Sequence, residues 1–143
     1  MFIGEYKYNL DVKNRLALPS KFRNLFIKGA IITKGLDNCL FIYTTKEWNK
    51  LAEKLSNLPF SQAKSRAFSR MVLAGAMDVK VDKQGRVILP DYLKSFAGLN
   101  KKIIIAGLYN RLEIWDEKMW SKYQKISEKD STEIAEGLSD LGI

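Results

Sequence analysis

Two acid–turn–arginine elements are the residues of this chain whose types and spacing could do chemistry. Asp11 is followed four residues later by Arg15, and Asp82 is followed by Arg86 at the same spacing. An Asp at the entry of a turn can accept backbone N–H groups of that turn, and it can also hold the guanidinium of an arginine four residues on. Such a pair would orient the arginine before a partner arrives and so lower the entropy cost of binding.

Each element taken alone is best explained as an ion pair that stabilises a turn. Two copies favour a binding role, because two arginine forks at a fixed spacing can contact two points on a duplex. Further polar side chains lie on the same turns and on the strands expected before them: Lys7, Lys13, Asn14, Lys80, Lys83 and Gln84. Lysines supply contacts to phosphates, whereas Asn and Gln reach base edges. Ordinary solvation explains any single lysine, but the cluster favours a polyanion partner.

Signals of catalysis are weak. The chain has no histidine and a single cysteine, Cys39, which lies in an apolar run and is expected to be a small core residue. This composition excludes Ser-His-Asp and Cys-His nucleophiles, histidine-ligated metals, cysteine zinc sites and an intrachain disulfide. Glycine-rich phosphate loops are absent. A carboxylate-dependent hydrolase built on Asp11 and Asp82 is a third reading, but an arginine competes for each carboxylate. We therefore expect that the protein is not an enzyme and that it binds no cofactor and no metal.

The charge is divided unevenly along the chain. The net charge is +8, from 24 Lys and Arg against 16 Asp and Glu. Residues 127–143 hold five acids and one base, a net −4, which leaves +12 on residues 1–126. A basic body suits a polyanion partner, although a soluble basic surface is the simpler explanation of charge alone.

The chain contains two copies of one unit. Residues 11–19 align with residues 82–90 at an offset of 71, and the Asp, the Arg, a Leu and the Pro coincide. Residues 35–43 align with residues 107–115 at an offset of 72, so the second copy has one extra residue between the two blocks. Two copies are too few for a solenoid. The expected outcome is a pseudo-twofold pair or two linked lobes.

Each copy predicts the same strands. Alternating apolar and polar residues predict a first strand, and a turn then leads to a second short strand that ends at a proline. Asn14 and Gly85 occupy the same place in the two turns, and both tolerate positive φ, so a left-handed backbone is expected there. A strand pair follows in each copy. The expected strands are 6–10, 16–18, 30–34 and 40–43, and 79–81, 87–89, 103–106 and 112–115.

Helices are expected after Pro19 and Pro90, over 20–26 and 91–96, because proline is tolerated in the first turn of a helix. Thr44 and Glu47 form a capping-box pattern that opens a helix over 45–55, and Asp116 is expected to cap the corresponding helix of the second copy. Residues 61–74 read as an amphipathic linking helix. Ile134, Leu138 and Leu141 in the acidic tail fit either a helix laid on a neighbour or a frayed end. The aromatic residues Phe41, Tyr43, Trp48, Trp115 and Trp120 are expected to pack, not to stack on bases.

We expect the chain to divide into a first repeat at 4–55, a linking helix at 56–75, a second repeat at 76–126 and an acidic tail at 127–143, and we expect each repeat to bind DNA. A hydrophobic content of 46% supports a real core. The N-terminus reaches charge too early for a signal peptide, and the apolar stretch near 103–108 is too short for a membrane span. We expect a cytoplasmic protein with no membrane partner and no evident small-molecule ligand.

These motifs resemble those of the MraZ family of bacterial regulators, within the wider AbrB-like, swapped-hairpin group. The resemblance covers roughly residues 1–125. It rests on Met1-Phe-x-Gly-Glu, Asp11-x-Lys-x-Arg15 with Leu18-Pro19, Gly35-Leu-Asp-x-Cys-Leu, Gly75-Ala76 before Asp82-Lys-Gln-Gly-Arg86-Val-x-x-Pro90, and Asn110-Arg-Leu-Glu-Ile-Trp-Asp116. Together these motifs are specific, whereas none of them is specific alone.

The resemblance implies an α+β, β-rich fold with short helices, in which two tandem AbrB-like half-domains form a pseudo-twofold swapped-hairpin barrel. It implies a homo-oligomeric ring that binds repeated sites on double-stranded promoter DNA and represses its own division and cell wall operon, hence nucleoid association. The family's DNA-contacting arginines correspond to Arg15 and Arg86, and the apolar tail is a candidate contact between subunits. The alternative is a ring-forming scaffold whose basic turns bind an acidic protein partner.

Overall fold

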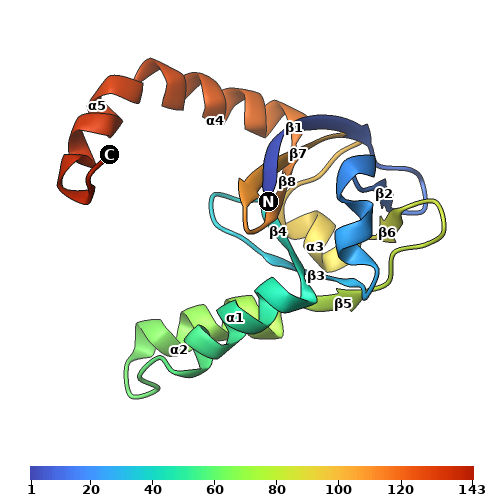
Figure 1. Cartoon of the computed structure of the whole chain (residues 1–143), viewed down its shortest axis with the longest axis horizontal. Helices are drawn as coiled ribbons and strands as arrows, with labels where there is room; N and C mark the ends of the chain where they lie inside the picture. Colours follow the sequence, from blue (N-terminus) through green and yellow to red (C-terminus); the bar gives the residue numbers. More distant parts are fainter.

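The strands form one six-stranded antiparallel sheet and one separate two-stranded ladder, and two helical arms extend from them (Figure 1). The computed structural model describes residues 1–143. The sheet contains, in spatial order, β1 (Phe2–Asn9), β7 (Lys102–Tyr109), β8 (Leu112–Asp116), β4 (Leu40–Thr44), β3 (Ala30–Lys34) and β5 (Met77–Val79). The ladder pairs β2 (Arg15–Ala17) with β6 (Arg86–Ile88).

The order of the strands is symmetric about the centre of the sheet. The first strand of each repeat pairs with a strand of the other repeat, β1 with β7 and β5 with β3. The strands β4 and β8 pair across the centre, as do β2 and β6 in the ladder. Each repeat therefore completes its sheet with a strand from the other, and the expectation of a pseudo-twofold pair of half-domains is confirmed.

The acid–turn–arginine elements are not two-stranded hairpins, which corrects the expectation that each motif spans a hairpin turn. The strand before the first turn, β1, pairs with β7, and the strand after it, β2, pairs with β6. The reason is that β2 pairs with β6 of the other repeat, in a separate ladder, instead of adding to the free edge of β1. Each turn therefore connects the large sheet to the ladder.

One core of 19 buried apolar side chains lies between the sheet and the ladder, and both repeats contribute to it. Leu16 and Val87 lie opposite each other at the centre of the ladder, and both are completely buried. Burial of such side chains contributes about 1.5–3 kcal/mol each. The core therefore stabilises the pairing of the two repeats as well as each repeat.

A smaller cluster on the other face of the sheet confirms that the aromatic residues pack. Cys39, Ile104 and Trp115 are buried there, with Trp120 and Phe41 against them. Burial, and after it the negative charge of Glu113, raises the pKa of the Cys39 thiol. The thiol is thus a core group, as the sequence predicts, and not a reactive one.

The short helices that follow the prolines are η1 (Ser20–Phe26), which is a 3₁₀ helix, and α3 (Asp91–Phe96). The long helices are α1 (Thr45–Ser56) and α4 (Glu117–Lys129). Thr44 caps α1, since its Oγ1 accepts the N–H of Glu47 at 3.2 Å. Asp116 does not cap α4, which corrects the sequence expectation, because its Oδ1 accepts the backbone N–H of Asn100 at 3.1 Å instead.

The linking segment is shorter and less regular than predicted, since α2 (Ala63–Ser69) passes into a π-helical turn, η2 (Arg70–Ala74). The segment folds back on α1 to form one arm, and α4 with α5 (Ser131–Gly137) and η3 (Ser139–Leu141) forms the other. Both arms project on the side away from the β2–β6 ladder (Figure 1). None of these helices has the length and apolar character needed to cross a membrane.

Candidate nucleic-acid interface

The first turn is held by the carboxylate of Asp11. Its Oδ1 accepts the backbone N–H groups of Lys13 at 2.9 Å and Arg15 at 2.8 Å, and its Oδ2 accepts the Arg15 Nε–H at 2.6 Å. Asn14 has a positive φ of 59°, and its N–H donates to the carbonyl of Asp11. One carboxylate thus fixes both the turn and the arginine side chain.

The second turn repeats this geometry. Asp82 Oδ1 accepts the N–H groups of Gln84 and Arg86, both at 2.9 Å, and Oδ2 accepts the Arg86 Nε–H at 3.0 Å. Gly85 occupies the position of Asn14 and has a φ of 76°. The residue types therefore encode the same local structure twice, as the sequence predicts.

The hydrogen bonds at each turn lower the pKa of its aspartate. The backbone N–H of Arg15 is the largest cause for Asp11, and that of Arg86 is the largest for Asp82, with the guanidinium bonds also lowering both values. The ionised carboxylates thereby stabilise the turns at neutral pH.

We expect both carboxyls to titrate below their ordinary value of 3.8. Because the folded-state pKa is depressed, the stabilisation is present above the ordinary value and is lost as the pH falls through the lower, folded value. Carboxyl ¹³C shifts measured by NMR across an acid titration test this. Arg15→Gln should raise the midpoint of Asp11 and leave that of Asp82 unchanged, and a midpoint at or above 3.8 in the unsubstituted protein contradicts the prediction.

The β2–β6 ladder brings the two turns together. The N–H of Leu18 donates to the carbonyl of Gly85 at 2.9 Å, and the N–H of Leu89 donates to that of Asn14 at 2.8 Å. Arg15 pairs with Ile88 and Ala17 pairs with Arg86, so the two arginines are diagonal neighbours, roughly 7–8 Å apart between Cα atoms.

The two arginines share the outer face of the ladder. Side chains alternate along a strand, so Arg15 and Arg86 lie opposite the face that buries Leu16 and Val87. Their side chains are 30% and 28% exposed. Each aspartate bonds the arginine through Nε, so the two terminal nitrogens of each guanidinium remain available to a partner.

Two basic residues that the sequence analysis missed also contact the turns. Arg23 of η1 lies over the second turn, where a Cβ added to Gly85 would collide with its guanidinium. Lys94 of α3 reaches the first turn, and its Nζ donates to Asn14 Oδ1 at 3.2 Å. Arg23 and Lys94 are related by the offset of 71, so the internal repeat was the signal that could have found them.

The predicted polar residues of the turns differ in their surroundings. Asn14 is engaged within the protein, since its Nδ2 donates to Asp91 Oδ1 at 2.7 Å. Lys13, Lys83 and Gln84 are exposed. Lys13 and Gln84 occupy equivalent positions, and Lys83 corresponds to Val12, which is 100% exposed. The two turns therefore present different side chains from one backbone shape.

Lys7 is not brought to the turns. It is exposed on the edge strand β1, on the same face as Glu5. Glu5 accepts the side-chain N–H groups of Trp120 at 2.8 Å and Gln124 at 2.9 Å, so this face carries α4. The chain also has no group of three or more His, Cys, Asp or Glu that could hold a metal ion.

Two partly exposed arginine forks held by carboxylates, with exposed lysines beside them, form a basic surface at the end of the molecule opposite the arms (Figure 1). Comparison with known proteins helps to identify what this surface binds. A family described as "MraZ protein, putative antitoxin-like" matches the chain twice, over residues 1–71 and 72–141. The chain belongs to the MraZ family. The two matches coincide with two repeats that exchange strands, and this MraZ fold is a pair of tandem AbrB-like halves.

Curated relatives of the MraZ family match from end to end. The chain is 48% identical to a protein of Clostridium acetobutylicum, 46% to one of Acetivibrio thermocellus and 46% to one of Clostridium tetani, each over 143 residues that cover 100% of both chains. Each relative is named "Transcriptional regulator MraZ". These relatives support a transcription regulator, and their names describe no enzyme.

Proposed function

We propose that this protein is a sequence-specific DNA-binding regulator that represses its own division and cell wall operon, binding repeated promoter sites as a homo-oligomeric ring. The observation that carries the proposal is the pair of aspartate-held arginines on the outer face of the β2–β6 ladder. The net +12 of residues 1–126 and the names of the relatives support it. In this proposal the protein is cytoplasmic and nucleoid-associated.

The arginines contact bases. Arg15 and Arg86 each keep two terminal nitrogens free, and this fork matches the O6 and N7 acceptors of guanine in the major groove. Asp11 and Asp82 hold the forks in place before DNA arrives, which reduces the entropy cost of binding. Gly85 and Asn14 supply the left-handed backbone that allows each carboxylate to reach its arginine.

The other basic residues act on the DNA backbone or on the turns. Lys13 and Lys83 are exposed and contact phosphates, and Gln84 reaches a base edge or a phosphate from the second turn. Lys7 is a phosphate contact at the edge of the sheet. Arg23 and Lys94 position the turns from behind, and each lies against the turn of the opposite repeat.

The proposed roles of the segments follow the two repeats. Residues 4–55 and 76–126 each supply one turn, residues 56–75 link them, and residues 127–143 contribute to assembly. A ring multiplies this pair of turns, so weak contacts at repeated DNA sites combine through effective concentration.

Binding to a duplex that carries the repeats upstream of the gene, compared with a scrambled duplex at fixed salt, tests the proposal. Specific DNA-binding proteins prefer their sites by at least about 1,000-fold, so a difference of that order is expected. A footprint on the same DNA should protect the repeats. Equal affinity for both duplexes would overturn sequence-specific binding and would favour nonspecific binding or an acidic protein partner.

A further inference from the structure

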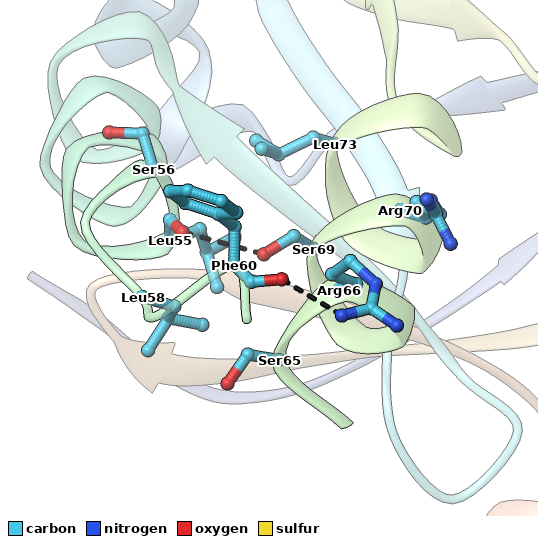
Figure 2. Close-up of a pocket in the computed structure, with 9 residues that line it drawn as sticks. All are labelled: Leu55, Ser56, Leu58, Phe60, Ser65, Arg66, Ser69, Arg70 and Leu73. Atoms are coloured by element: carbon cyan, nitrogen blue, oxygen red, sulfur yellow. Dashed lines mark hydrogen bonds between the residues drawn. The ribbon is translucent and has the colours of Figure 1, made fainter. Parts of the chain in front are cut away.

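The arm formed by α1, α2 and η2 contains a groove that the proposed DNA-binding face does not use. Its apolar lining comes from Leu55, Leu58, Phe60 and Leu73, and Arg66 and Arg70 lie along one side (Figure 2). The Phe60 side chain is 85% exposed although it is large and apolar. Hydrogen bonds join the segments that line the groove, since Ser69 Oγ donates to the Leu55 carbonyl and Arg66 Nη1 donates to the Phe60 carbonyl (Figure 2).

The groove fits a peptide segment better than a small molecule. Its volume is about 250 Å³, which is below the roughly 300–1,000 Å³ of ordinary small-molecule sites. No acidic residue lines it, so its charge comes from the two arginines. An apolar groove with a basic side suits an amphipathic helix that carries negative charge.

The C-terminal segment of this chain has this character, and it consists of the short helix α5 followed by the 3₁₀ turn η3. Residues 131–143 are all exposed, in α5, η3 and the residues that flank them. Ile134 lies in α5, Leu138 at its C-terminal cap and Leu141 in η3, at spacings of four and three that a continuous helix would place on one side. Residues 127–143 carry a net −4. The segment therefore matches the groove in both apolar pattern and charge.

The two surfaces lie on separate arms of one chain. In Figure 1, α5 curls at the end of α4, and α1 and α2 leave the body as a different arm. We propose that the α5–η3 segment of one copy docks in the α1–α2 groove of a second copy. This inference rests on the proposed self-association and names the surfaces that carry it.

The proposed contact has two consequences for assembly. A tail and a groove are different surfaces, so the contact is head-to-tail and can close into a ring. Both arms also lie on the side away from the β2–β6 ladder (Figure 1), so docking leaves the arginine turns free for DNA.

Charge reversal at Arg70 tests the docking in the full-length protein. Arg70 is exposed and forms no hydrogen bond or ion pair through its side chain, so Arg70→Glu should leave the fold intact. We expect it to weaken self-association at least about 10-fold, as measured by sedimentation, because it places like charges together. Lys54→Glu makes the same charge change on the same arm outside the groove and should leave the assembly unchanged. Adding Glu133→Arg and Glu136→Arg to Arg70→Glu should restore association.

Disulfide trapping gives a second test that does not depend on charge. A chain with Phe60→Cys is mixed with a chain carrying Leu138→Cys and oxidised, and a crosslinked heterodimer is expected. Val12→Cys replaces Leu138→Cys in the control and should not crosslink, because Val12 lies on the turn face. If the unsubstituted protein is an oligomer, and neither the crosslink nor the effect of Arg70→Glu is observed, the docking is overturned while the ring stands. If the unsubstituted protein is monomeric, both are overturned.

Discussion

Replacing Arg15 and Arg86 together by alanine is expected to abolish specific binding to the promoter repeats while the fold and the oligomeric state remain intact. A bidentate contact between arginine and a base contributes about 1–3 kcal/mol of discrimination, so the loss of two such contacts lowers affinity by at least about 30-fold. Both side chains lie on the outer face of the ladder, opposite the face that buries Leu16 and Val87, so stability should change little. Affinity for the repeats, measured at fixed salt beside circular dichroism and sedimentation, checks this.

Two comparisons separate recognition from loss of charge. Lys54→Ala with Lys122→Ala removes the same charge from the exposed helical arms and should leave binding nearly unchanged. Arg15→Lys with Arg86→Lys keeps the charge but removes the planar fork, so it should reduce the preference for the repeats more than nonspecific affinity. Unchanged affinity in the alanine double variant would show that the arginine turns are not the site.

The single variants Arg15→Ala and Arg86→Ala should both weaken binding, and comparing them measures the asymmetry between the turns. The first turn is tied to α3 through Asn14, whereas the second has Gly85 under the guanidinium of Arg23. If the structural symmetry governs recognition, the two losses will be similar.

Leu16→Ala is expected to lower the free energy of unfolding by about 2–5 kcal/mol, the range for deleting a buried leucine side chain. Leu16 is completely buried and lies opposite Val87 at the centre of the ladder. The ladder joins the two repeats, and β1 and β5 each pair with the opposite repeat. The whole chain should therefore unfold in a single transition, shifted to a lower denaturant concentration, and the two repeats should not melt separately.

The matched control is Val12→Ala on the first turn. Val12 is 100% exposed, so removing its methyl groups should change stability by less than about 0.5 kcal/mol. Urea unfolding followed by far-UV circular dichroism and tryptophan fluorescence measures both variants. Two separate transitions would contradict the exchange of strands. A Leu16→Ala variant that is as stable as the original protein would also contradict it.

The internal repeat, the turns and most element positions follow from the sequence alone. Asp11 and Asp82 bond groups only two to four residues away, so residue types and spacing are sufficient to predict the two turns. The positive φ of Asn14 and Gly85 follows in the same way, because few residues adopt that backbone shape. The repeat in turn indicated two equivalent halves.

Only the tertiary structure decided how these local pieces combine. The alignment of the two copies places Gly35 opposite Gly107, but their positions in the structure differ. Gly35 follows β3, whereas Gly107 lies within β7 opposite Gly4. A Cβ at Gly107 would collide with the backbone of β1. Three features depend on residues that are distant in sequence. They are the strand partners, the contacts of Arg23 and Lys94 with the opposite turns, and the hydrogen bond from Asn100 that keeps Asp116 from capping its helix. Local hydrogen bonds are specified by a few neighbouring residue types, whereas the pairing of strand edges is selected by the core that the whole chain buries.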